Sequence, residues 1–194
     1  MNATAALARQ LENLIRLGTI AEVQYRPPRV RVRSGNLLTA WLPWLTLRAG
    51  DSKTWDPPSV DEQCVLFSPS GQTANGIVLV GLNSDQHPAN GDRPGLHRRT
   101  YPDGAVIEYD SVAHRLRATL PAGGITDLIS SGGINITGPI NHQGDYVHQG
   151  NYTQQGNQAI TGQVTASVDV IAAGVSLVTH EHIGNLGRPT SPPL

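Results

Sequence analysis

Glycine recurs at every sixth residue from Gly138 to Gly162, and this spacing restricts the fold more than any other feature of the chain. Val168 occupies the next place in the series, and Gly174 returns to the register. A helical face repeats about every 3.6 residues, so this period does not lie on one side of an α-helix. It is instead typical of β-helices and β-solenoids.

The places two and four residues after each glycine continue the pattern. Even offsets point the same way along an extended chain, so these places share one face with the glycines. The second place holds Ile140, Tyr146, Tyr152, Gln158, Val164 and Val170. The fourth place holds His142, His148, Gln154, Ile160, Ala166 and Ala172. The repeat therefore predicts one continuous face assembled from six-residue cells.

A single chain has too few of these cells to bury a core of its own. A left-handed hexapeptide helix needs about three cells per coil and several coils, whereas this run holds roughly six cells. Three identical chains wound together resolve the shortage, because each supplies one side of a triangular prism. Glycine relieves crowding where the strands bend. The repeat thus predicts a homotrimer in which folding and assembly are one event.

The alternative for this region is a disordered tail rich in Gln and Asn, which the strict glycine register disfavours. Disorder usually combines low hydrophobicity with high net charge, whereas this chain has a net charge of -1 and 15% charged residues. With 21 glycines and 5% aromatics, the composition suits stacked, repetitive β-structure. The balanced charge gives no indication of a nucleic-acid partner, which normally meets a basic stripe.

The N-terminal part is predicted to begin with a short helix over residues 2–17. Asn2 can cap this helix, leucines recur at Leu7, Leu11 and Leu14, and Gly18 is expected to stop it. The first residues lack the basic start and long apolar run of a secretory signal, and no stretch is long enough to span a membrane. A soluble protein made in the cytoplasm is therefore expected.

Five short strands are predicted between residues 18 and 82, with a long proline-rich loop over 43–60, and this pattern fits a small closed barrel of the OB type. The predicted strands are Gly18–Val23, Arg29–Arg33, Leu37–Leu42, Cys64–Phe67 and Gly76–Leu82.

Alternating arginines mark the second of these strands. Val30 and Val32 are predicted to face the interior, and Arg29, Arg31 and Arg33 the other side. That side is either solvated and partner-facing or a phosphate-binding stripe, and the absence of stacking aromatics in the strand disfavours the stripe. Cys64, the only cysteine, is predicted to be a small buried hydrophobe, and it excludes an internal disulfide.

Residues 83–97 are predicted to be a linker, because Gly, Pro, Asn and Ser are frequent there. A hairpin is expected next, with strands over Ala105–Tyr109 and Leu116–Leu120, ended by the turn Pro121–Gly124.

Two histidines near the end of the chain, His180 and His182, are candidate metal ligands. On a strand they point to the same side, with Glu181 outward. Two imidazoles alone make a poor site, and an isolated His-x-His is usually a surface accident or a pair satisfied within the fold. On a threefold axis they become six nitrogens, which suit an octahedral transition metal such as iron, nickel or zinc. The Gly- and Pro-rich residues 183–193 would let the chain fold back and close the point.

His142 and His148 also belong to the repeat, where a structural role is expected for them. No role is assigned to the remaining histidines, which are His87, His97 and His114.

Several motifs together resemble one known family. They are Gly18–Ile20, Arg29–Val32, Trp41–Leu45, Pro57–Pro58, Ser68–Gly71, Gly76–Leu79, Asp103–Asp110 and Thr179–His182. Over nearly its whole length the chain resembles the baseplate assembly protein V family, the tail spikes of P2-like phages and R-type bacteriocins. The Trp-Leu-Pro-Trp run and the closing His-x-His carry most of the specificity. Glu181 departs from the family pattern, which often has a small polar residue there.

The resemblance implies an all-β homotrimeric needle: an OB-fold barrel, an intertwined triple-stranded β-helix and a metal-bound apex. One iron ion per trimer would be held octahedrally by His180 and His182 of each chain, with another transition metal as the alternative. The implied domains are a helix over 1–17, the OB domain over 18–82, a linker over 83–97, the shaft over 98–178 and the apex over 179–194.

The implied function is that of a central spike rather than an enzyme, with no catalytic or cofactor-binding residues. The spike would sit in a virion or a bacteriocin particle, contact the tail hub and baseplate proteins, and pierce the host outer membrane when the sheath contracts. The helix over 2–17 and the loop over 43–60 are the expected hub contacts.

Three alternatives are kept. One is the spike of a type VI secretion-like system, and another is an OB-fold nucleic-acid-binding protein with a repetitive tail. The third is a cell-wall-degrading enzyme, for which the chain has no spare domain and no evident carboxylate pair.

Overall fold

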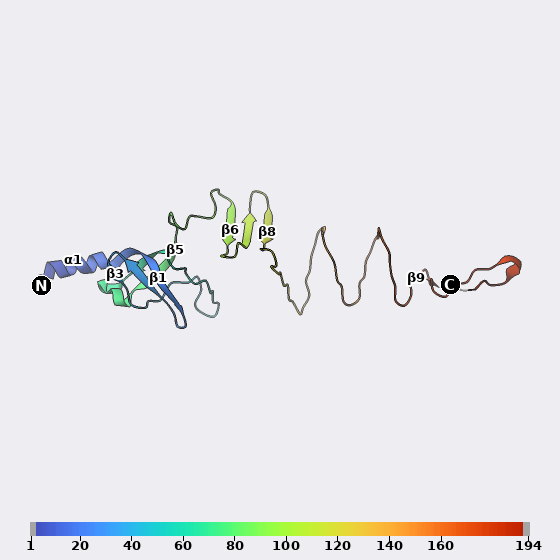
Figure 1. Cartoon of the computed structure of the whole chain (residues 1–194), viewed down its shortest axis with the longest axis horizontal. Helices are drawn as coiled ribbons and strands as arrows, with labels where there is room; N and C mark the ends of the chain where they lie inside the picture. Colours follow the sequence, from blue (N-terminus) through green and yellow to red (C-terminus); the bar gives the residue numbers. More distant parts are fainter. Residues whose placement is uncertain (1–2, 192–194) are drawn as a thin grey trace. The chain divides into compact units, whose positions relative to one another are not determined.

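A computed structural model describes residues 3–191, which form two compact units that divide between Ser131 and Gly132 (Figure 1). The predicted cap at Asn2 and the last three residues of the predicted apex, 192–194, lie outside the described residues. The first unit contains the long helix and most of the strands, and the second contains the glycine repeat.

The N-terminal helix α1, Ala3–Leu14, leads directly into the long strand β1, Ile15–Tyr25. The prediction that Gly18 stops the helix was wrong, because Gly18 lies within β1. A Cβ at this position would lie 2.5 Å from Val32 Cγ1 and 2.7 Å from the Arg33 carbonyl oxygen. Gly18 is therefore needed for a close approach between strands, and pairing with the sheet outcompetes continuation of the helix. No described helix is both long enough and apolar enough to cross a membrane.

Four further strands complete an antiparallel sheet with the order β3-β2-β1-β4-β5. Their bounds are Pro28–Ser34 for β2, Leu37–Leu38 for β3, Gln63–Phe67 for β4 and Ile77–Leu82 for β5. Short 3-10 turns at Pro69–Gly71 and Thr73–Asn75 join β4 to β5. All five strands predicted in this region are present, although β3 is much shorter than expected.

The predicted closed barrel is not formed by the described strands. The segment after β3 approaches both ends of the sheet through isolated bridges, from Leu42 to Val30 in β2 and from Trp44 to Val78 in β5. Pro43 lies between these two bridges and lacks an N–H group, so the segment cannot make a continuous ladder. The Pro43 carbonyl still accepts from the Val78 amide at 3.0 Å.

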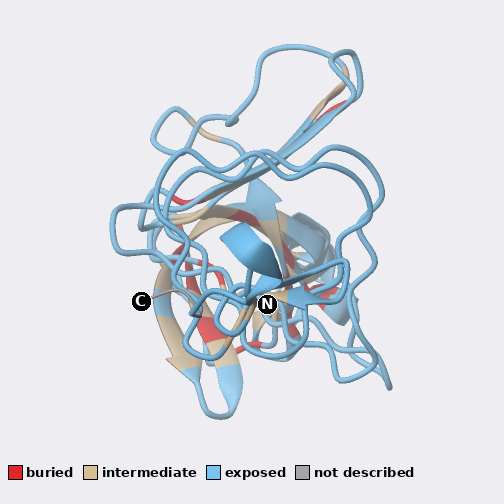
Figure 2. Ribbon diagram, turned by 90° about the vertical axis from the view of Figure 1, so that its right-hand side faces the viewer, coloured by how far each residue is buried: buried red, intermediate tan, exposed pale blue. Residues whose placement is uncertain are grey.

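The core of the first unit lies within this sheet, where Figure 2 shows the buried residues in red. Its fully buried members are Ile20, Val30, Val32, Leu42, Cys64, Leu66 and Val78. The predicted inward positions of Val30 and Val32 are therefore confirmed, as is the burial of Cys64. Burial, reinforced by the nearby charge of Glu62, raises the pKa of the Cys64 thiol to about 11, so the thiol stays protonated.

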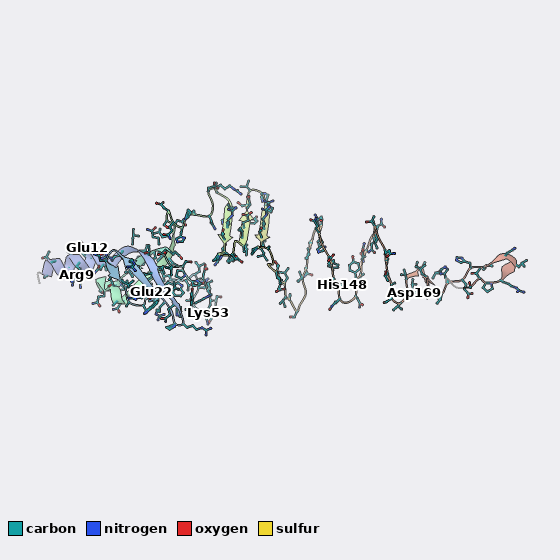
Figure 3. The ribbon with its side chains drawn as sticks, in the orientation of Figure 1. Arg9, Glu12, Glu22, Lys53, His148 and Asp169 are labelled. Atoms are coloured by element: carbon teal, nitrogen blue, oxygen red, sulfur yellow. The ribbon has the colours of Figure 1, made fainter. Side chains whose placement is uncertain are left out.

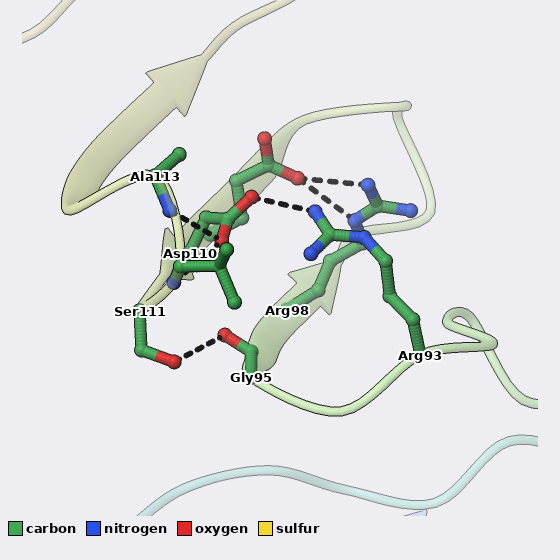
Figure 4. Close-up of polar contacts among 8 residues, drawn as sticks. Arg93, Gly95, Arg98, Asp110, Ser111 and Ala113 are labelled. Atoms are coloured by element: carbon green, nitrogen blue, oxygen red, sulfur yellow. Dashed lines mark hydrogen bonds and ion pairs between the residues drawn. The ribbon is translucent and has the colours of Figure 1, made fainter.

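A separate sheet with the order β6-β7-β8 follows, with strands at Leu96–Thr100, Val106–Asp110 and Arg115–Thr119. The predicted hairpin corresponds to β7 and β8, and β6 begins just inside the predicted linker. Figure 4 shows polar contacts at one end of this sheet, where Arg93 contacts Asp110, the last residue of β7, at 2.6 Å. The hydrogen bond from Arg93 and the amides of Ala113 and Val112 hold the pKa of the Asp110 carboxyl well below its usual range.

The glycine repeat has a regular backbone without regular hydrogen bonding. Residues 134–169 lie in no described helix or strand, and their trace in Figure 1 is an open coil. The two-stranded sheet that follows consists of β9, Ile171–Ala172, and β10, Val175–Ser176. The triple-stranded β-helix expected over 98–178 stays a prediction, because it requires chains beyond this one.

Candidate functional site: the repeat face and the apex

The glycines of the repeat adopt one conformation at a constant interval. Gly138, Gly144, Gly150 and Gly156 have φ angles of 123°, 121°, 117° and 112°, and Gly162 has 150°. The backbone bends at each of these places and again at Val168. Side chains other than glycine rarely adopt such φ angles, so the glycines set the corner of every six-residue cell.

Aromatic side chains from the second and fourth places form a row along the repeat. His142, Tyr146, His148 and Tyr152 follow one another with ring-centroid distances of 5.8, 6.3 and 6.0 Å. Tyr146 and His148 are nearly parallel, and Figure 3 labels His148 in this region. The prediction that these two places share one face is confirmed. His142 and His148 contact the tyrosines of this row, and the structural role expected for them stays a prediction.

The apolar side chains of this face are uncovered. Ile140, Tyr146 and Val164 are 70%, 69% and 67% exposed, and none of residues 132–191 is buried. The described backbone hydrogen bonds also include none that joins residues 134–169 to another segment. An exposed apolar stripe of this kind is typical of surfaces that associate with other proteins.

A polar loop precedes the apex and was not anticipated from the sequence. Asp169 Oδ1 accepts hydrogen bonds from the amides of Val170 at 2.7 Å and Val178 at 3.3 Å. A hydrogen bond from the Ser176 hydroxyl, assisted by these amides, holds the pKa of Asp169 below its usual range. The sequence does mark this loop, because the acidic Asp169 directly follows Val168, the position at which the glycine series is interrupted.

The two predicted metal ligands are brought together by the structure. The imidazole rings of His180 and His182 are 5.1 Å apart and nearly perpendicular, while Glu181 is exposed. His180 Nδ1 lies 3.0 Å from the Ser176 carbonyl oxygen. Because a carbonyl can only accept, this hydrogen bond requires a proton on Nδ1. The lone pair of the neutral ring is then on Nε2, where it is available to a metal.

The chain folds back immediately after the histidines, as the Gly and Pro residues predicted. The Thr190 amide donates to the His182 carbonyl oxygen at 2.7 Å, and Ile183 forms an antiparallel bridge with Pro189. The turn is a 3-10 segment at Asn185–Gly187. His182 is thereby held at the base of a closed hairpin.

One chain does not supply a complete metal site. Among residues 3–191, no group of three or more His, Cys, Asp or Glu side chains could hold an ion. The donor chemistry nevertheless fits a transition metal, since imidazoles suit iron, nickel and zinc. A complete site would therefore need ligands from outside the described residues.

The helix α1 offers a second exposed apolar surface, on which Leu7 and Leu11 are 58% and 59% exposed. The turn at Pro69–Gly71 fixes this helix to the sheet. A Cβ at Gly71, whose φ is +70°, would collide with the backbone of Gln10. The leucine side of α1 stays exposed despite this close packing.

Residues 16–82 match the family described as the type VI secretion system/phage-baseplate injector OB domain. The chain belongs to this phage baseplate family, as its motifs predicted.

A curated relative, the spike protein of Escherichia phage P2, is 40% identical to the chain over 134 residues. The match covers 69% of this chain and 62% of the relative, so the chain spans less than two thirds of the relative's length.

Proposed function

We propose that the protein is the central spike of a contractile tail, carried in a phage virion or bacteriocin particle and acting without catalysis. The observation that carries this proposal is the repeat, which has a regular backbone but buries none of its side chains within one chain. The phage P2 relative, named a spike protein, supports the same role.

Three chains wound around a common axis would bury the face of the repeat that is exposed in one chain. The exposed Ile, Val and Tyr side chains would then pack into one shared core, which is the main source of stability in such an assembly. Backbone groups of residues 134–169 would pair between chains, as backbone groups removed from water must. The result would be a triple-stranded β-helix that is stiff along its axis.

An apical metal would complete the needle. Two imidazoles from each of three chains give six ligands, and His180 Nε2 is already oriented by the bond from Nδ1 to the Ser176 carbonyl. Iron is the proposed metal, with nickel or zinc as alternatives. The ion would tie the three chain ends together at a narrow point.

In this role the spike transmits force. Sheath contraction would drive the trimer through the outer membrane, and the stiff shaft would concentrate that force on the apex. The tail hub and other baseplate proteins would bind the first unit, for which the leucine face of α1 and the loop after β3 are available surfaces. The type VI secretion system named by the matching family uses the same domain, and that setting is the nearest alternative.

The nucleic-acid alternative receives less support from the arginine strand. Arg31 Nη1 contacts Glu22 at 2.8 Å, and Arg31 Nε donates to the Thr39 carbonyl at 2.9 Å. Arg31 is thus engaged within the fold. A stripe for single-stranded nucleic acid would need free cations interleaved with stacking aromatics along the strand.

Native mass spectrometry of the full chain, with elemental analysis of the same sample, tests the proposal. The expected mass is that of three chains plus one transition-metal ion. A His180→Ala, His182→Ala double variant is expected to remain trimeric and lose the ion, and Glu181→Ala is the matched control that keeps it. A monomeric wild-type protein would overturn the spike, and a double variant with full metal content would overturn the ligand assignment.

A further inference from the structure

A cavity of about 600 Å³ lies beside the sheet of the first unit, and neither the metal apex nor the repeat accounts for it. One wall comes from the start of β2, with Pro28 and Arg29. The other walls come from the segment after β3, with Pro43, Trp44 and Trp55 among the lining residues. Prolines and aromatic rings therefore make up much of its surface.

The aromatic side chains at this cavity contact one another, and one of them, Trp55, is largely uncovered. Trp55 lies between Trp44 and Tyr25, with ring-centroid distances of 6.1 and 6.3 Å. Trp55 is nevertheless 62% exposed. A large aromatic surface left in water is costly, and Trp is among the residues that most often anchor interfaces.

Three cations surround the cavity without carboxylate partners. Arg29, Arg48 and Lys53 line it, and none of them takes part in an ion pair among the described residues. Figure 3 labels Lys53 on this loop. The only lining carboxylate, Asp56, is already paired with Arg99. The rim therefore has a local excess of positive charge, although the whole chain has a net charge of -1.

The cationic wall is held in place by its own hydrogen bonds. The Thr46 and Thr54 hydroxyls lie 2.6 Å apart, and the Thr54 amide donates to the Arg48 carbonyl at 3.0 Å. The loop is fixed to β5 where the Leu45 amide donates to the Val78 carbonyl at 2.8 Å. A loop ordered before binding lowers the entropy cost of taking up a ligand.

We propose that this cavity is a docking site for an acidic, extended peptide segment of another protein, with a proline or aromatic anchor seated against Trp44 and Trp55. Proline-rich segments dock in aromatic-lined grooves, and acidic motifs are recognised by clustered cations, so the cavity combines two known modes of peptide recognition. The three cations surround one cavity and do not form a track, which favours a short peptide over a nucleic-acid strand.

Peptide binding at this cavity does not rest on the proposed spike function, whereas a partner within the baseplate would rest on it. The test uses the full-length protein and fluorescence anisotropy of labelled hexapeptides. The probes are Asp-Glu-Xaa-Pro-Asp-Glu with Phe, Leu or Pro at Xaa, the same peptides with Lys at every acidic place, and a labelled oligothymidine. Saturable binding is expected of at least one acidic probe and not of its Lys counterpart.

Two variants and a matched control locate the site. Arg48→Glu and Trp55→Ala are each expected to weaken binding at least ~10-fold, a change of about 1.4 kcal/mol. Arg9→Glu makes the same charge change on the exposed helix α1, where Figure 3 labels Arg9, and is expected to leave binding unchanged. Circular dichroism melting verifies that each variant is folded.

Four outcomes would overturn the proposal. Two concern the peptides: no acidic probe binds saturably up to ~1 mM, or the Lys peptides bind as tightly as the acidic ones. The third is that Arg9→Glu weakens acidic-peptide binding as much as Arg48→Glu does. The fourth is that the oligothymidine binds more tightly than the acidic peptides and Arg48→Glu abolishes that binding. The oligomeric state and metal content of the sample are measured separately. A failed docking site is therefore distinguishable from a failed spike.

Discussion

The two units of this chain contain similar apolar side chains but use them in opposite ways. In the first, β-branched residues such as Ile20, Val30 and Val32 are fully buried in a sheet of one chain. In the second, Ile140 and Val164 are 70% and 67% exposed, although the backbone of the repeat bends at a constant interval. A repeating backbone therefore does not by itself bury apolar side chains. Among residues 3–191, buried side chains occur only in the first unit.

The difference follows from the kind of chain reversal each unit uses. In the first unit, turns bring β2 beside β1 and β5 beside β4, and the longer connection after β3 brings β4 beside β1, so each strand pairs within the chain. The repeat bends at each glycine, and its coil stays open. Such a coil leaves its apolar side chains exposed within one chain.

The largest effect is expected from a charge on the shared face of the repeat. Val164→Asp would place three carboxylates in the proposed trimer core, where burying unpaired charge costs several kcal/mol per copy. Loss of the trimer is expected in sedimentation velocity, with the first unit still folded. Thr165→Asp is the control, because Thr165 lies three residues after Gly162, off the shared face, and threonine is similar in shape to valine. This variant should remain trimeric. A Val164→Asp trimer of wild-type stability would contradict the common core.

A cavity in the first unit should produce a smaller and local effect. Ile20→Ala removes a fully buried side chain and is expected to cost about 3 kcal/mol in the unfolding free energy of this unit. Chemical denaturation followed by Trp fluorescence reports on this unit, because all three tryptophans lie in it. Ile77→Ala, at a site 38% exposed, is the matched control and should cost less. Equal losses would argue against the core assigned here.

A glycine of the repeat should matter through its backbone conformation alone. Gly150 has a φ of 117°, and a Cβ added there would have open space around it to 4 Å, so Gly150→Ala introduces strain without a clash. The expected cost is about 2 kcal/mol per chain, seen as a lower melting temperature of the shaft. Gly132→Ala is the control, since Gly132 has equal space but no positive φ. If the two variants melt alike, the glycine conformation does not support the shaft.

The smallest effect is expected from the ion pair of the second sheet. The pKa of Asp110 is lowered in the folded state, so its stabilisation is complete above the ordinary carboxyl pKa of about 3.9 and is lost as the pH falls below it. Asp110→Asn should therefore melt earlier than wild type at neutral pH, and this difference should shrink as the pH is lowered towards the folded-state pKa. Asp85→Asn, at an exposed site, is the control. A difference in melting temperature that stays constant over this pH range would contradict the stabilising ion pair between Arg93 and Asp110.

Much of the functional region was predictable because its signals are local. The period of six fixed the shared face, on which Tyr146 and His148 indeed stack. Alternation along one strand predicted the burial of Val30 and Val32. The adjacent His180 and His182 rings followed from their two-residue spacing. Asp169 was missed because its amide partner at Val178 lies nine residues along the chain, beyond any short pattern.

The sequence by itself determined where the chain repeats, which strand faces point inward and which histidines form a pair, because each depends on spacings of two or six residues. Only the tertiary structure decided that Gly18 lies in a strand against Val32, that Leu42 and Trp44 reach different ends of the sheet, and that two tryptophans share a cationic cavity. Those contacts join residues distant in sequence. They are selected by competition for burial and for backbone partners, which no local pattern records.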